Sequence, residues 1–135
     1  MHRHHHGYTW LGSGFELHRD GPRREVHPAF GSSPLPPLEV AQWLLKAGAL
    51  VQGTWEAPEP AAQWYASQVR PHAADFADAH ERAVLAARLS GVGARIAEGQ
   101  DVVGGWWLAG RRFLSVCLVA CSPHPVRTAY TCPVG

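Results

Sequence analysis

The sequence lacks the features that mark membrane, secreted or disordered proteins. No apolar run approaches the roughly 20 residues that a helix needs to cross a bilayer. Arg3 and the histidines near the N-terminus are not followed by the apolar stretch of a secretory signal. Charged residues make up only 17% of the chain, too few for a disordered protein. We therefore expect a soluble protein with no membrane contact, cytoplasmic by default.

Basic residues show neither a surplus nor a cluster. The formal net charge is +1, whereas general nucleic-acid binders carry a strong basic surplus. Lys46 is the single lysine among twelve basic residues, and the arginines are scattered along the chain. This distribution argues against a nucleic-acid partner and against a phosphate site.

Length and hydrophobic content predict one domain. The chain has 135 residues, of which 46% are hydrophobic, enough to form one ordinary core. Residues 1–6, Met-His-Arg-His-His-His, are expected to form a mobile His-rich end, either native or a tag remnant. Residues 7–135 are expected to form a single α+β domain.

Local patterns predict a small antiparallel sheet packed by about three helices from the middle of the chain. Aromatic and apolar residues around Gly12-Ser13-Gly14 predict an N-terminal hairpin over residues 8–18. Residues 113–120 are almost continuously apolar, which predicts a central strand of a C-terminal hairpin. The remaining expectations are short strands at 24–27 and 49–54, helices at 37–46, 58–69 and 71–88, and a hairpin strand at 102–108.

Three cysteines, an odd number, argue against a disulfide framework. Cys121, His124 and Cys132 are candidate zinc ligands near the C-terminus. Cys117 is expected to be a buried hydrophobe, because four strand residues would separate it from Cys121 by roughly 13 Å. A fourth ligand would have to come from His27 or the N-terminal histidines. Without paired Cys-x₂-Cys motifs, the sequence predicts no structural zinc, and a Cys121–Cys132 disulfide stays an alternative.

One acid–base pair and one aromatic cluster are the other candidate sites. His72 and Asp75 lie three residues apart, so on a helix the carboxylate could orient the imidazole as a general base. Trp106 and Trp107 are adjacent in an expected strand and must point to opposite faces of the sheet. If one of them is exposed, it would form a binding surface with Arg111 and Arg112 across the turn.

The leading functional hypothesis is a non-enzymatic binding or accessory protein that uses the Trp/Arg surface. Its partner would be another protein or a second copy of the chain, and a small-molecule ligand is also compatible with the sequence. The alternatives are a small enzyme or ligand-binding domain built on His72 and Asp75, and a metal-stabilised module built on the C-terminal cysteines and histidine. No motif requires a cofactor, and none defines a reaction.

Overall fold

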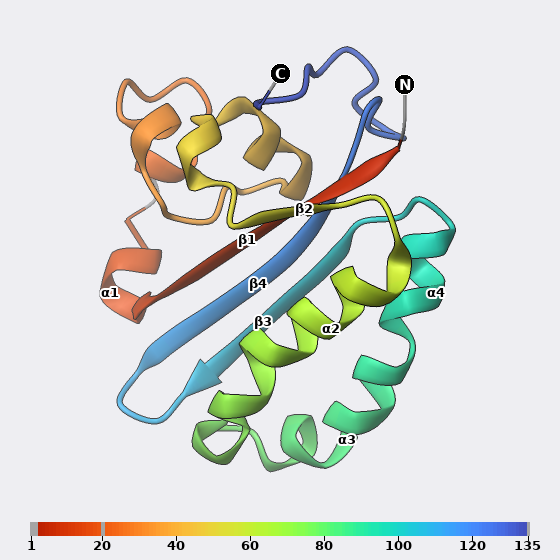
Figure 1. The fold of residues 1–135 in the computed structure, drawn as a ribbon. Coiled ribbons are helices and arrows are strands. Elements are labelled where there is room, and N and C mark those ends of the chain that lie inside the picture. The colour runs from red at the N-terminus through yellow and green to blue at the C-terminus, as the bar shows by residue number, and fades with distance from the viewer. Residues whose placement is uncertain (1–2, 20, 135) are drawn as a thin grey trace.

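A computed structural model describes residues 3–19 and 21–134 and is built on one four-stranded antiparallel sheet. The spatial order of the strands is β2-β1-β4-β3, so β1 and β4 form its centre. The α+β class expected from the sequence is confirmed (Figure 1). The strands are β1 (His4–Ser13), β2 (Gly53–Trp55), β3 (Val102–Leu108) and β4 (Arg112–Cys121).

Helices α2 (Pro58–Val69), α3 (Ala79–Ser90) and α4 (Val92–Ala97) lie together on one face of the sheet (Figure 1). Proline in the first turn of α2 suits a position that needs no backbone donor. Asp78 caps α3 by accepting backbone N–H bonds, which is the usual role of an Asp at that position. None of the described helices is both long enough and apolar enough to cross a membrane.

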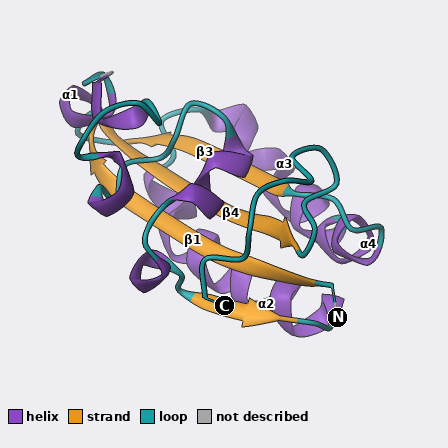
Figure 2. Ribbon diagram, turned by 90° about the horizontal axis from the view of Figure 1, so that it is seen from above, coloured by secondary structure: helices purple, strands orange, loops and turns teal. Residues whose placement is uncertain are grey.

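Short helices and irregular segments cover the opposite face (Figure 2). The proline- and glycine-rich stretch between β1 and β2 cannot sustain a long α-helix. The helix expected at 37–46 is accordingly a 3₁₀ helix over Val40–Leu45. The other short elements are α1 (Gly14–Leu17), η1 (Gly21–Arg23), η2 (Phe30–Ser32), η4 (Gly48–Leu50) and, between α2 and α3, η5 (Arg70–Asp75).

Strand β4 is central and has apolar cores on both of its faces, as its continuous apolar run predicts. Its side chains alternate between the faces, so every second residue packs under the helices. On the helix side the core includes Tyr65, Trp106, Leu114, Val116 and Leu118. On the other side it includes Tyr8, Trp43, Cys117, Val119 and Cys121.

The N-terminal region differs from the expected hairpin over 8–18. β1 runs without a turn to Ser13, whose hydroxyl accepts the Glu16 N–H and begins α1. Capping by Ser13 therefore ends the strand where a turn was expected. The expected strand at 24–27 is a series of turns. Of the expected strand at 49–54 only residues 53 and 54 pair with β1, and the strand continues to Trp55.

The expectation of a mobile end at residues 1–6 is wrong for His4, His5 and His6. These residues begin β1 and pair with β4, and His5 and His6 also pair with β2. His5 and His6 are buried. Backbone pairing on two sides holds the segment in place, while Met1 and His2 lie outside the described residues.

The buried lysine, Lys46, links the segments that cover the face of the sheet opposite the long helices. Its ammonium group donates to the carbonyl oxygens of Phe30 (2.9 Å) and Ser33 (2.8 Å). It also lies 3.9 Å from the centre of the Phe30 ring, within reach of a cation–π contact. Burial lowers the pKa of Lys46 to about 8.

Candidate metal centre

Four metal-ligating side chains converge where β1 begins and β4 ends. His4 and His6 point to the same face of β1 because strand side chains alternate. Cys121, the last residue of β4, is the direct ladder partner of His4. Cys132 reaches the same place from the C-terminal tail. The four candidate ligand atoms all lie within 4.8 Å of one another.

Three of the distances between these atoms are close to the edges of a zinc tetrahedron. With Zn–N near 2.0–2.1 Å and Zn–S near 2.3 Å, tetrahedral angles require ligand atoms about 3.3–3.8 Å apart. The Nε2 atoms of His4 and His6 are 3.1 Å apart. The Cys132 sulfur lies 3.3 Å from Nε2 of His6 and 3.6 Å from Nε2 of His4. The cluster is therefore close to the size that one zinc ion needs.

A neighbouring strand orients the His6 imidazole. Nδ1 of His6 lies 2.8 Å from the hydroxyl of Thr54, its ladder partner on β2. When Nδ1–H donates to that hydroxyl, Nε2 presents its lone pair to the cluster. Metal-bound imidazoles in proteins commonly use their second nitrogen in this way.

Burial favours the neutral forms of two of the four side chains, His6 and Cys121. The side chains of His6 and Cys121 are 0% and 2% exposed. Burial lowers the pKa of His6 to about 4 and raises the pKa of the Cys121 thiol. The imidazole is thus in the neutral form that binds metal. Two thiolates with one divalent cation would also give a net charge of zero, which suits a buried site.

The phenol of Tyr8 is a polar group that the described residues leave without a partner. Its hydroxyl oxygen is fully buried and makes no hydrogen bond to them. Burial, together with the charges that Cys121 and Cys132 would carry, raises its pKa. A hydroxyl that stays protonated is a hydrogen-bond donor, and a metal-bound thiolate is an acceptor that would suit it.

The candidate ligands from the sequence divide into two groups. Cys121 and Cys132 belong to the cluster, whereas Cys117 lies outside it, as strand spacing predicts. The side chains that join them in the cluster are His4 and His6 rather than His27. Alternation of histidines at two-residue spacing was the available signal, but it has meaning only if residues 4–6 form a strand.

His124 lies outside the cluster and holds the tail instead. Its Nδ1 accepts the backbone N–H groups of Val126 (3.1 Å) and Arg127 (3.0 Å). Its Nε2 therefore carries the proton and donates to the Asp101 carboxylate at 2.8 Å. Both nitrogens are occupied, so this buried histidine positions the loop that leads to Cys132.

The expected acid–base pair lies in η5. This short helix is next to the β3–β4 turn, at the opposite end of the sheet from the metal cluster. The Asp75 carboxylate is 4.0 Å from the Arg112 guanidinium, and both side chains are largely solvated. The backbone carbonyl of Asp75 accepts a hydrogen bond from the N–H of Ala109. No described contact orients the imidazole of His72, so catalysis by His72 and Asp75 stays a prediction.

The paired tryptophans point to opposite faces, as strand alternation predicts. Trp106 is 5% exposed and stacks on Phe76, whereas Trp107 is 42% exposed and stacks on His18. Trp107 lines a hollow of about 710 Å³ together with Arg111 and the highly exposed Phe15. Arg112 points away from this hollow, toward Asp75.

Comparison with known proteins gives no further guide to this site: no family model, no curated protein and no solved structure matches the chain.

Proposed function

We propose that the chain is a zinc-stabilised module in which His4, His6, Cys121 and Cys132 bind one Zn²⁺. The observation that carries the proposal is the convergence of four nitrogen and sulfur atoms within 4.8 Å. Two thiolates and two imidazoles that can surround one ion tetrahedrally are typical of zinc. Magnesium and calcium prefer oxygen ligands.

The ligand count supports a structural role for the ion. Catalytic zinc sites keep one position open for water or substrate, whereas structural sites are closed by four protein ligands. Here four side chains are available, and two of them are fully or almost fully buried. The ion would bind and stabilise, and it would not present a reactive water.

The ion would tie together three parts of the chain that are distant in sequence. These parts are the start of β1, the end of β4 and the tail that carries Cys132. An ion bound only by the folded chain adds its binding free energy to the stability of the fold. The end of the sheet where β1 begins and β4 ends would thereby gain a cross-link without a disulfide.

Metal analysis of the full 135-residue chain, with no added purification tag, tests the proposal. The expected result is one zinc per chain, with an affinity in the nanomolar range or tighter against a chromophoric chelator. Cobalt substitution should give the intense visible absorption of a tetrahedral ion and a sulfur-to-metal charge-transfer band. Cys121→Ser, Cys132→Ser and His6→Gln should each lose the tightly held ion.

Two matched variants control for adventitious binding by a His-rich end. His5→Gln changes a histidine on the same strand whose imidazole instead bonds the Gln100 carbonyl. Cys117→Ala removes a buried thiol that lies outside the cluster. Both should retain one zinc. Equal loss of zinc in His5→Gln and His6→Gln, or a Cys121–Cys132 disulfide in the freshly purified protein, would contradict the proposal.

A second candidate function is protein binding through the surface formed by Phe15, Trp107 and Arg111. The specific observation in its favour is the partial exposure of Trp107 beside an arginine, over a largely apolar hollow. Tryptophan and arginine are enriched among residues that dominate binding energy. The test is Trp107→Ala, which should weaken binding of a partner or self-association by about 2 kcal/mol without unfolding the chain.

A further inference from the structure

Strand β3 forms one edge of the sheet, and its outer side is covered only at its two ends. Near the end of β3, the N–H of Ala77 donates to the carbonyl of Trp107 at 2.9 Å. Just before the start of β3, the Arg95 guanidinium donates to the carbonyl of Asp101 at 3.2 Å. Between these points no described strand pairs with the outer side of β3.

Val103 and Gly105 present their backbone groups to this open side. In an antiparallel ladder, alternate residues direct both N–H and C=O to the same edge. Because the backbone carbonyl of Trp107 points away from β4, the backbone N–H and C=O groups of Gly105 and Val103 do so as well. Among the described residues, nothing bonds the N–H or C=O of either one. Val103 is 57% exposed, and the stretch has none of the lysines or prolines that usually protect an edge.

Two hollows meet at this stretch, one on each face of the sheet. Val103, Gly104 and Gly105 line both a hollow of about 170 Å³ on the helix side and one of about 230 Å³ opposite. A Cβ atom at Gly104 would collide with the Tyr65 hydroxyl, and one at Gly105 with the Phe113 ring. The missing side chains therefore let these two rings reach the strand. A strand added here would direct alternate side chains into the two hollows.

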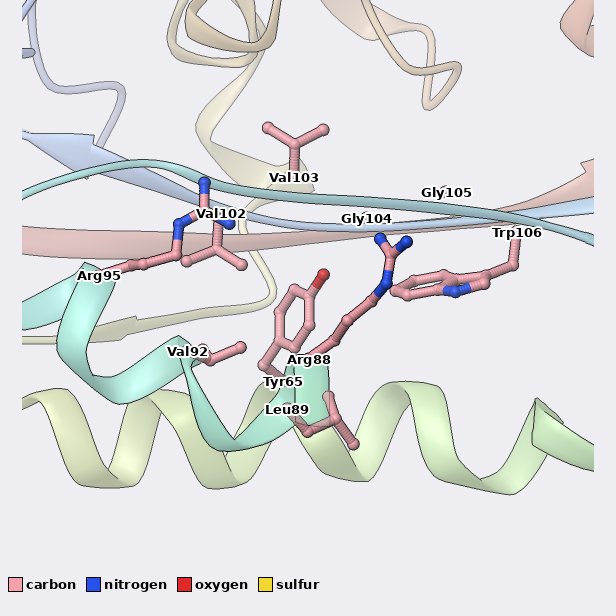
Figure 3. Close-up of a pocket in the computed structure, with 10 residues that line it drawn as sticks. All are labelled: Tyr65, Arg88, Leu89, Val92, Arg95, Val102, Val103, Gly104, Gly105 and Trp106. Carbon is pink, nitrogen blue, oxygen red and sulfur yellow. The ribbon is translucent and has the colours of Figure 1, made fainter. Parts of the chain in front are cut away.

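The hollow on the helix side is basic and hydrogen-bonding. Tyr65 of α2, Arg88 of α3 and Arg95 of α4 all extend toward β3, as Figure 3 shows. The Arg88 guanidinium also contacts the Glu81 carboxylate at 3.1 Å through one of its nitrogens. Its other N–H groups can donate to another acceptor. Two guanidinium groups and a phenol suit a carboxylate.

The hollow on the opposite side is mainly apolar. Arg23 also lines it, but its guanidinium donates to the carbonyls of Pro36 and Leu17. The apolar part of its lining consists chiefly of Pro36, Pro37, Leu38, Trp43 and Phe113. Short aliphatic side chains fit such a space better than charged ones.

We propose that the open edge of β3 binds an extended peptide segment of a partner protein by strand addition at Val103–Gly105. An acidic side chain of the peptide faces Arg88, Arg95 and Tyr65, and its aliphatic neighbours enter the opposite hollow. Main-chain hydrogen bonds supply affinity, and the two hollows select the alternating acidic and aliphatic pattern. This inference goes beyond the zinc site and does not rest on it.

Charge argues against a second copy of the chain as the occupant. Pairing of two β3 edges about a twofold axis normal to the sheet would place the helices of both copies on the same side. Arg88 and Arg95 of one copy would then approach the same residues of the other. Like charges at an interface oppose association, whereas an acidic peptide neutralises them.

Fluorescence anisotropy with a labelled peptide of sequence Ser-Val-Glu-Val-Glu-Val-Ser and the full chain tests the proposal. Val103→Pro removes an outward N–H without removing a bond to β4, and should weaken binding about tenfold or more. Val103→Thr keeps that N–H and should bind like the parent. Arg88→Gln and Arg95→Gln should each weaken binding about tenfold, and Arg70→Gln, at an exposed arginine outside both hollows, should not.

The same measurements can overturn the proposal. The peptide with both Glu residues replaced by Lys should fail to bind, so equal binding of the two peptides contradicts the basic hollow. Unchanged binding by Val103→Pro contradicts strand addition. Sedimentation of the chain alone gives the remaining outcome: a dimer that Val103→Pro converts to monomer would assign the edge to a second copy instead.

Discussion

His4 and Cys121 are direct partners in the β1–β4 ladder, although they come from nearly opposite ends of the chain. Their pairing is set by backbone hydrogen bonds along the two central strands, not by any local motif. Two of the four candidate zinc ligands are therefore brought together by the register of the sheet itself. The other two join them from the same face of β1 and from the tail.

Removing zinc should release the tail before it disturbs the helices. Arg127 lies in the tail between Cys121 and Cys132, and its guanidinium pairs with Glu39 at 2.7 Å on the surface. Because surface ion pairs contribute only about 0–1 kcal/mol, this contact adds little to the hydrogen bonds by which His124 holds the same segment. Tryptic cleavage after Arg127 should become faster on chelation, while cleavage after Arg70 stays unchanged. Equal acceleration at both sites would instead indicate global unfolding.

Deleting Met1 to His6 should be strongly destabilising. The deletion removes two proposed ligands and the ladder pairs of His4, His5 and His6 with β4. We expect a loss of more than about 3 kcal/mol in the free energy of unfolding for the zinc-loaded protein. Urea unfolding of the full and shortened chains measures it. A loss below about 1 kcal/mol would mean that the segment is not docked.

The two adjacent tryptophans should respond differently to truncation. Trp106 is enclosed between the sheet and Phe76, so Trp106→Ala should cost roughly 3–5 kcal/mol of stability. Trp107 contacts Phe113 and His18 from a partly solvated position, so Trp107→Ala should cost about 1 kcal/mol. Chemical unfolding of both variants is the measurement. Two equally large losses would remove the case for a binding surface at Trp107.

Lys46 should make stability rise with pH on the alkaline side. Its folded pKa is about 8, whereas the unfolded chain keeps the ordinary value near 10.5. Between these values the unfolded state binds more protons, so the free energy of unfolding from this group increases as pH rises. The expected gain between pH 7.5 and 10 is on the order of 1–2 kcal/mol.

Lys46→Met provides the reference for that measurement, because cysteine, tyrosine and metal effects are common to both proteins. The difference in free energy of unfolding, parent minus variant, should increase with pH. A difference that decreases would mean that the hydrogen bonds to Phe30 and Ser33 stabilise the ammonium more than burial opposes it.

Much of the fold could be predicted because the signals were local. The apolar run at 113–120 predicts the central β4, and the strand expected at 102–108 is β3, its hairpin partner. Pro58 marks the start of α2. The N-terminal hairpin was wrong because Gly12 and Gly14 allow a turn without requiring one. Whether such a strand continues depends on its neighbours in the sheet.

The sequence by itself determined which side chains are able to bind metal, and it correctly separated Cys117 from Cys121 by strand spacing. Only the tertiary structure decided that His4 and His6, not His124, lie in one cluster with Cys121 and Cys132. That choice depends on the β1–β4 register and on the path of the tail, which the His124–Asp101 hydrogen bond helps to fix. Both are contacts between residues far apart in the chain, and the periodicity of a single segment carries no information about its partner.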